Sequence, residues 1–341
     1  MSRGIVAMSG GVDSSVAAAL MVAEGHEVVG VTMRLWDNPA DEGCCSVAEI
    51  DDARRVADQL GIAHWVWSFT DDFEDQVVAP YVAAHAAGRT PNPCIDCNRH
   101  LKFGRFLRRA TQLGFDWVAT GHHARSDRAG GQYRLLRGAD AVKDQSYVLY
   151  VLGQAELARC RFPVGALTKA EVRARAAALG LRTAAKPDSQ DACFVTTGGG
   201  RAAFLGPRIP LHPGRVVDVT GATLGRVDAV ELVTVGQRRG LGTGGGGDRR
   251  YAVAVDAARA TVVAGGLDDL RTGGVRLEDM AWVGPPAEGR VQAQSSAHGN
   301  PVGALLEETT VRFDEPQRRV APGQSVVLYR GDEVLGGGVA A

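Results

Sequence analysis

The stretch Ala7–Leu20 reads AMSGGVDSSVAAAL, which places a turn rich in glycine and serine between an apolar run and a helix-forming run. Gly10 and Gly11 allow a tight turn, and the amides that begin the following helix can cradle an anion. The turn lacks the lysine of the G-x-x-x-x-G-K-[ST] loop, which excludes that class of NTPase. Asp13 inside an anion cradle is understandable if magnesium accompanies the phosphates. The stretch therefore predicts a phosphate-binding loop after a first strand.

Composition limits the classes of protein that this chain can be. At 341 residues, with 45% apolar and 23% charged residues, it has the length of two or three globular domains. The absence of a long apolar run, and of room for a signal segment before the loop, predicts a cytoplasmic protein without a membrane partner. A net charge of −1 provides no general attraction to nucleic acid, so any such contact needs local basic patches.

The order of apolar and helical runs predicts an α/β fold with a doubly wound parallel sheet over residues 1–205. Beyond it, Gly and Pro recur between short alternating runs, which predicts two smaller β-rich domains, 206–268 and 269–341, the last one barrel-like. The strands expected in the first domain are Ile5–Met8, Val28–Met33, His64–Phe69 and Trp117–Gly121. Its expected helices are Ser14–Glu24, Ser46–Leu60, Lys102–Leu113 and Thr168–Leu179. Later strands are expected at Val216–Val219, Glu231–Val235, Tyr251–Val255, Val311–Phe313 and Val326–Tyr329.

The chain has six cysteines. A disulfide framework is not expected in a cytoplasmic protein of this size, so a metal, redox or nucleophilic role is considered for each. Cys94 and Cys97 form a CxxC in RTPNPCIDCN, and Cys193 lies in DSQDACFV. Structural zinc is disfavoured because only that pair has ligand spacing. The remaining three, Cys44, Cys45 and Cys160, are expected to be plain buried cysteines.

The SGGVDSS segment resembles the pyrophosphate loop of the ATP pyrophosphatase (PP-loop) superfamily, whose members cleave ATP between its α and β phosphates and adenylate an oxygen. Further segments, RTPNPCIDCN, KDQSY, DSQDACF, GQRRGLG and FDEPQRRVAPGQSVVLY, extend the match through nearly the whole chain. With them the chain resembles the tRNA-specific 2-thiouridylases of the MnmA type. That resemblance implies a transferase that thiolates C2 of the wobble uridine (position 34) of tRNA and releases AMP and pyrophosphate.

The same resemblance assigns roles to individual residues. Cys193 would carry the sulfur as a persulfide, and Cys97 would free the sulfur from it, leaving a disulfide. ATP, bound with Mg²⁺, would contact Ala7, Met8, Ser9, Gly10, Gly11, Val12, Asp13, Ser14, Met33 and Gly121. The target base in the anticodon loop would contact Asn92, Pro93, Cys94, Lys143, Asp144 and Gln145. The partners implied are tRNA and a sulfur donor such as a cysteine desulfurase or a relay protein.

Several alternatives stay open from the sequence. Cys94 stands where some family members have aspartate, so Cys94, Cys97 and Cys193 could together hold an iron–sulfur cluster. Ser295 and Ser296 stand where the family often has an arginine–tyrosine pair that faces tRNA. A basic stripe either meets tRNA phosphates or is a solvated helix face, and it comprises Lys102, Arg105, Arg108 and Arg109. The alternative functions are a PP-loop synthetase that adenylates a small molecule and a non-catalytic tRNA-binding or sulfur-carrier protein.

Overall fold

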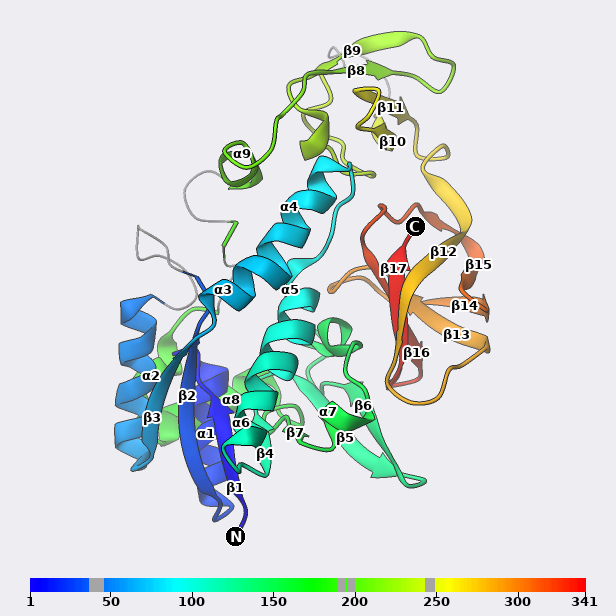
Figure 1. The fold of residues 1–341 in the computed structure, drawn as a ribbon. Helices are drawn as coiled ribbons and strands as arrows, with labels where there is room; N and C mark the ends of the chain where they lie inside the picture. The colour runs from blue at the N-terminus through cyan, green and yellow to red at the C-terminus, as the bar shows by residue number, and fades with distance from the viewer. Residues whose placement is uncertain (37–45, 189–193, 196–199, 243–248) are drawn as a thin grey trace.

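The computed structural model describes residues 1–36, 46–188, 194–195, 200–242 and 249–341. Its N-terminal part is built on a parallel five-stranded sheet in the order β3-β2-β1-β4-β7 (Figure 1). These strands are β1 (Arg3–Ala7), β2 (Glu27–Arg34), β3 (Ala63–Ser68), β4 (Trp117–Ala119) and β7 (Cys160–Arg161). The predicted α/β class with a parallel sheet is confirmed.

Helices cover both faces of this sheet, as expected for a doubly wound fold. One face carries α1 (Val12–Ala23), α2 (Val47–Leu60) and α8 (Lys169–Ala178), which share a buried cluster with the sheet. The other face packs against α3 (Thr70–Phe73), η1 (Glu74–Val78), α4 (Ala79–Ala86), η2 (Cys97–Phe106) and α6 (Leu107–Gln112). The segment TKAE (residues 168–171) begins α8 with a capping box: the Thr168 side chain accepts from the Glu171 backbone nitrogen, and the Glu171 carboxylate accepts from the Thr168 backbone nitrogen.

Strand order places a ligand site in this sheet. From β1 the chain crosses to β2 and β3 on one side, whereas β4 pairs with β1 on the other side. Ligands of open α/β sheets bind beyond the carboxyl ends of strands where the order reverses in this way. The loops after β1 and β4 are therefore the expected walls of the site.

The helix predicted at Lys102–Leu113 begins earlier and is irregular. It starts as the short α5 (Pro93–Asp96) and continues as the π-helical η2 and then α6. The CxxC thus spans the join between α5 and η2. Widened helical turns of this kind occur frequently at functional sites.

The C-terminal part is a closed antiparallel barrel, which confirms the barrel-like prediction. Six strands follow the order β12-β15-β14-β13-β16-β17, and pairing between β12 and β17 closes the ring. Their bounds are β12 (Arg271–Trp282), β13 (Gly289–Gln294), β14 (Val302–Glu307), β15 (Thr310–Arg318), β16 (Ser325–Arg330) and β17 (Glu333–Ala340).

A hairpin joins the N-terminal part to the barrel. Strands β5 (Ala124–Ala129) and β6 (Gln132–Arg137) leave the parallel sheet, and β6 pairs with β17 through Leu135 and Leu136. Two short elements follow near this junction, η3 (Ser146–Leu149) and α7 (Gln154–Leu157). Sequence reasoning did not find this hairpin.

The middle part of the sequence forms a small sheet in the order β10-β11-β8-β9, which lies at the top of the view in Figure 1. Its strands are β8 (Gly214–Val217), β9 (Thr223–Val227), β10 (Tyr251–Asp256) and β11 (Thr261–Gly265), and η4 (Arg182–Ala185) and α9 (Gly200–Leu205) precede it. The strand predicted at Glu231–Val235 is wrong, because Val230–Leu232 forms a 3₁₀ turn, η5. The Glu231 carboxylate turns inward there and accepts hydrogen bonds from the backbone N and Nδ1 of His212. Among the helices that the structure describes, none is both long and apolar enough to cross a membrane.

Candidate active site

The loop after β1 holds its shape through its own serines. Gly10 has φ of 72°, and a Cβ there would lie 2.3 Å from the carbonyl oxygen of Glu49, so the position requires glycine. Ser14 Oγ and Ser15 Oγ donate to the carbonyl oxygen of Gly11 at 3.1 and 2.8 Å. Gly11 is the N-cap of α1 and has no side chain with which to cap the first amides of the helix. Those amides therefore face the site as donors for an anion.

The loop after β4 lies directly against this cradle. A Cβ on Gly121 would come within 2.6 Å of the Ser14 backbone nitrogen, so the two loops touch through their backbones. Met33 lies near the end of β2, the strand that pairs with β1 on its other side. The structure thus brings the segment 7–14, Met33 and Gly121 to the same end of the sheet.

Asp13 is held by two basic side chains from distant segments. Lys169 Nζ donates to Asp13 Oδ1 and Oδ2 at 2.8 and 2.7 Å, and His123 Nε2 donates to Oδ1 at 3.2 Å. Burial raises the pKa of Asp13, but the hydrogen bonds from His123 and Lys169 outweigh it and lower the pKa overall. Lys169 is the first residue of α8, and only 12% of its side chain is exposed. Sequence reasoning missed it, although the TKAE helix start was the available signal.

Lys169 also contacts a second carboxylate, that of Asp188. Its Nζ lies 2.9 Å from Asp188 Oδ1, while Lys143 Nζ and Arg173 Nη2 each approach Asp188 to 2.7 Å. Burial raises the pKa of Asp188, but hydrogen bonds from Lys143 and Lys169 bring it well below its ordinary value. A continuous chain of ion pairs, Asp13–Lys169–Asp188–Lys143, thus joins the phosphate loop to the KDQ segment (residues 143–145). With Arg173 the cations outnumber the carboxylates, which favours an anionic ligand.

A further cation reaches the loop from the opposite side. Lys186 Nζ donates to the carbonyl oxygen of Gly10 at 3.0 Å and to Asp52 Oδ2 at 3.0 Å. It therefore fixes the loop to α2, whose Asp52 and Glu49 carboxylates offset its charge.

The other two residues of the KDQ segment make bonds within the protein. Asp144 accepts hydrogen bonds from Arg137 Nη1 at 3.0 Å and from Ser146 Oγ at 2.8 Å, and only 7% of its side chain is exposed. Gln145 Oε1 accepts from the backbone nitrogen of His123 at 2.9 Å. In this structure both side chains hold the segment in place.

The CxxC segment is anchored next to the KDQ segment. Asn92 Oδ1 accepts from the Cys94 backbone nitrogen at 3.1 Å, and Pro93 occupies the first turn of α5. Asn98 Nδ2 donates to the carbonyl oxygen of Val148 in η3 at 3.0 Å. The two segments assigned to the target base therefore lie side by side.

The cysteines differ in environment. Cys94 and Cys97 are partly exposed, whereas Cys160 is buried in β7, where burial raises the pKa of its thiol and keeps it inert. Cys193, Cys44 and Cys45 lie outside the described residues. Within the described ranges, no three His, Cys, Asp or Glu side chains are grouped to hold a metal.

The predicted basic stripe is largely engaged in the fold. Arg105 Nε lies 3.2 Å from Asp72 Oδ2, and the Arg109 guanidinium stacks 4.5 Å from the Trp67 ring centroid. Lys102 is half-buried, and Arg108 is the exposed member. The stripe is thus not a row of solvated charges.

A glycine-rich anion cradle at the reversal point of a doubly wound parallel sheet, flanked by lysines, defines an α/β nucleotide-binding protein of the PP-loop type. Family models agree along the chain: a tRNA methyl transferase HUP domain matches residues 2–197, a tRNA methyl transferase PRC-barrel domain matches 202–266, and an aminomethyltransferase β-barrel domain matches 272–340. The chain belongs to the MnmA family of tRNA-specific 2-thiouridylases.

Relatives match over almost the whole length. The tRNA-specific 2-thiouridylase MnmA of Chloroflexus aurantiacus is 46% identical over 353 residues, covering 99% of this chain and 98% of the relative. The enzyme of the same name from Mycobacteroides abscessus is 48% identical over 356 residues, with 98% of each chain covered. Among solved structures, a 4-thiouridine synthetase–RNA complex with bound ATP aligns at 18% identity and a TM-score of 0.38, over 57% of this chain and 45% of that chain. The two structures share only part of their folds.

Proposed function

We propose that this protein forms 2-thiouridine at the wobble position of tRNA, with ATP as the activating substrate. The observation that supports this most directly is the ion-pair chain Asp13–Lys169–Asp188–Lys143. It places the phosphate loop against the segment that is expected to contact the target base. We further propose residues 1–205 as the catalytic unit, with 206–268 and 269–341 as accessory β domains.

The first step activates the base. The C2 oxygen of uracil is a poor leaving group, so it attacks the α-phosphorus of ATP and pyrophosphate departs. The amides at the start of α1 hold the phosphates, and Lys169 neutralises the charge that develops on pyrophosphate. Asp13 fits as a single carboxylate ligand for the Mg²⁺ that arrives with ATP, since Mg²⁺ at phosphate sites commonly uses one or two carboxylates. Bound there, the ion supplies charge neutralisation at the phosphates.

The second step delivers sulfur. The terminal sulfur of a persulfide on Cys193 attacks C2, and AMP leaves with the former C2 oxygen. The Cys97 thiolate then attacks the Cys193 sulfur, which breaks the sulfur–sulfur bond and leaves sulfur on the base. The product is 2-thiouridine with a Cys97–Cys193 disulfide, which a thiol reductant must reduce before the next turnover. A cysteine desulfurase or a relay protein is the proposed source of the persulfide.

An iron–sulfur cluster would use the same cysteines. Cys94 and Cys97 of the CxxC supply two thiols. The third candidate, Cys193, lies outside the described part of the chain. A cluster would need at least one further protein ligand, for which Cys193 is the candidate. Iron and sulfide analysis after anaerobic purification decides between the two carriers.

The test is a reaction containing ATP, tRNA and a sulfur donor, with AMP and thiolated uridine measured separately. We expect AMP to form only when tRNA is present, together with mercury-retarded tRNA. AMP formation from a small molecule without tRNA would support the synthetase alternative. Binding of tRNA with no AMP at all would support a non-catalytic carrier.

A further inference from the structure

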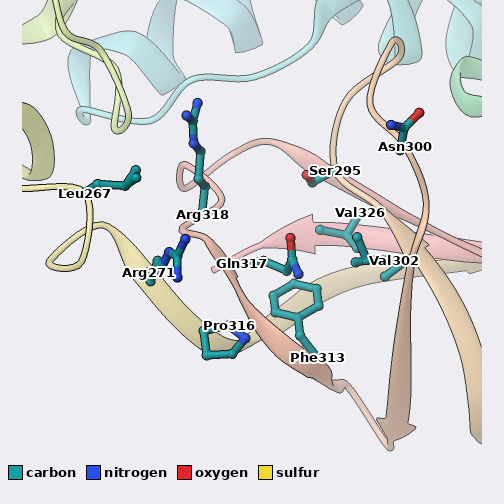
Figure 2. A pocket seen from close by; sticks show the side chains of 11 residues that line it. Leu267, Arg271, Ser295, Asn300, Val302, Phe313, Pro316, Gln317, Arg318 and Val326 are labelled. Atoms are coloured by element: carbon teal, nitrogen blue, oxygen red, sulfur yellow. The ribbon is translucent and has the colours of Figure 1, made fainter.

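A cavity of about 380 Å³ opens at the end of the barrel where β12 begins and β15 ends (Figure 2). Among its lining residues, Ala293 and Val326 are buried barrel residues, and Phe313 packs partly against the same core. Its rim carries polar side chains, Ser295 and Asn300 among them. The exposed lining of the cavity is mostly polar, which suits a polar or charged ligand, and the proposed reaction does not use this cavity.

Two arginines lie on adjacent strands at this rim, and the Arg318 side chain extends away from Arg271 (Figure 2). Arg271 and Arg318 are directly paired in the β12–β15 ladder, where like charges destabilise a sheet. Within the part of the chain that the structure describes, neither guanidinium has a carboxylate at ion-pairing distance. The Arg318 guanidinium instead lies 6.0 Å from the ring centroid of Tyr251 in β10.

Neighbouring arginines of the same barrel are neutralised. Arg290 pairs with Asp314 at 2.5 Å, and Arg312 pairs with Glu307 at 2.6 Å. The guanidinium groups of Arg271 and Arg318 differ from these two, because no ion pair with a described carboxylate offsets their charge. An anion bound between Arg271 and Arg318 would remove the repulsion between them.

The lining also indicates what the anion is part of. Guanidinium groups bind phosphate oxygens in a bidentate fashion. Below them, the Phe313 ring offers a stacking surface and the amide oxygen of Gln317 an acceptor for the edge of a base (Figure 2). The amide nitrogen of Gln317 donates to the carbonyl oxygen of Glu315 at 3.1 Å. Unpaired RNA bases are recognised by this combination of aromatic stacking and edge hydrogen bonds. The volume lies in the range of small-ligand pockets and suits one nucleotide.

We propose that this cavity binds one unstacked nucleotide of the tRNA substrate, with its phosphodiester on Arg271 and Arg318 and its base over Phe313. The proposal rests on the proposed function and adds to it a contact far along the chain from the phosphate loop. The expected occupant is RNA, because both arginines lie on the open rim, where the phosphates of a continuing strand can reach them.

The test compares two double variants of the full chain with equal loss of charge. R271Q/R318Q removes the rim charges, while R290Q/R312Q removes two arginines that are already neutralised. Equilibrium binding of tRNA is measured over a series of salt concentrations. We expect the salt slope of R271Q/R318Q to fall by about 0.7 for each lost phosphate contact on single-stranded RNA, and the slope of R290Q/R312Q to stay at the wild-type value. Phe313→Ala should weaken binding without changing the slope.

The outcomes are separable. If the wild-type protein thiolates tRNA but R271Q/R318Q retains its slope and affinity, the cavity proposal alone is overturned. If the wild-type protein neither binds nor thiolates tRNA, both proposals fail. Loss of ATP binding in R271Q/R318Q with an unchanged tRNA slope would make the cavity a mononucleotide site and would also overturn the proposal. Should the double variant fail to fold, the single variants Arg271→Gln and Arg318→Gln, both at exposed positions, are each expected to show a slope reduced by about 0.7.

Discussion

The guanidinium of Arg137 lies 3.6 Å from the centroid of the Tyr329 ring, so the last residue of β6 packs on a strand of the C-terminal barrel. The same guanidinium donates to Asp144 and to Gln294 Oε1. Ser146 Oγ donates to Asp144 and lies 3.2 Å from the Tyr329 hydroxyl. Burial raises the pKa of Tyr329 to about 12, so this phenol stays neutral. The KDQ segment is therefore positioned from both sides of the domain junction.

Asp144→Ala should destabilise the protein, because it leaves the Arg137 charge without its partner in a largely buried setting. We expect the free energy of unfolding to fall by about 3–5 kcal/mol, measured by denaturant titration. The matched control is Asp127→Ala, which removes an exposed pair with Arg134 and should change the free energy of unfolding far less. If Asp144→Ala has the same free energy of unfolding as the control but binds tRNA more weakly, the Asp144 side chain contacts RNA and does not stabilise the junction.

Asp13→Ala should abolish tRNA-dependent AMP formation. Asp13 is the carboxylate proposed to hold Mg²⁺ at the phosphates, and no substitute oxygen would remain at that position. Asp51→Ala, which removes an exposed carboxylate paired with Arg54, should leave AMP formation unchanged. Near-normal AMP release by the Asp13 variant would refute the assignment of the phosphate loop.

Lys169→Met should lower AMP formation by at least about 100-fold, the size typical for loss of one preorganised charge that stabilises a transition state. Lys143→Met removes a contact to Asp188 alone, so it should retain ATP binding and lose activity mainly through a higher KM for tRNA. Steady-state kinetics with each substrate varied in turn separates the two. Equal effects of both variants on the KM for ATP would contradict distinct roles.

Removing Lys169 should also change the response of the protein to acid. The pKa values of Asp13 and Asp188 are lowered in the folded state, so these carboxylates stabilise the protein above their ordinary value of 3.8. That stability is lost as pH falls below 3.8 toward the lowered folded-state values. In Lys169→Met both pKa values should rise, and the loss on acidification should become smaller. Thermal midpoints measured between pH 3 and pH 7 test this, and parallel curves for the variant and the wild type would contradict it.

The cysteines test the order of the chemistry. Cys193→Ser should bind ATP and tRNA almost normally and yet form no thiolated product, because serine cannot carry a persulfide. Cys97→Ser should also form no product, although a sulfur donor should still add one sulfur atom to the Cys193 peptide, which mass spectrometry detects. Cys160→Ser should be nearly silent. Thiolation by the Cys193 variant at an unimpaired rate would rule out the persulfide, and loss of bound iron and activity in Cys94→Ala would support the cluster instead.

Arg109→Gln should reduce stability, whereas Arg108→Gln should not. Arg109 stacks on Trp67, and such a contact contributes about 0.5–2 kcal/mol. Arg108 is exposed and is the stripe residue best placed to meet a phosphate. Its loss should lower the salt slope of tRNA binding by at most about 0.9. A larger fall for Arg109→Gln than for Arg108→Gln would restore the view of the stripe as an RNA-binding face.

The sequence predicts those features that depend on local pattern. The glycine-rich turn between Ala7 and Val16 predicts the anion cradle. The order of apolar and helical runs predicts the parallel sheet, and short alternating runs predict the barrel. Lys169 was missed because its role depends on α8 being folded next to α1, and no spacing along the chain records that contact. The β-branched residues near Glu231 predict a strand. In the structure the Glu231 carboxylate accepts hydrogen bonds from His212, and the segment forms a 3₁₀ turn. Long-range contacts of this kind are visible only in three dimensions.

The pairing of β6 with β17 has a consequence for protein synthesis. Ser146 and Tyr329, which meet at this junction, are 183 positions apart, so the ribosome makes the barrel strands long after the phosphate loop and the KDQ segment. A nascent or prematurely terminated chain can thus complete the nucleotide cradle while the segment expected to receive the base still lacks its support. Competence to modify RNA would then arise only with the last strands, so an incomplete translation product would bind ATP without acting on tRNA.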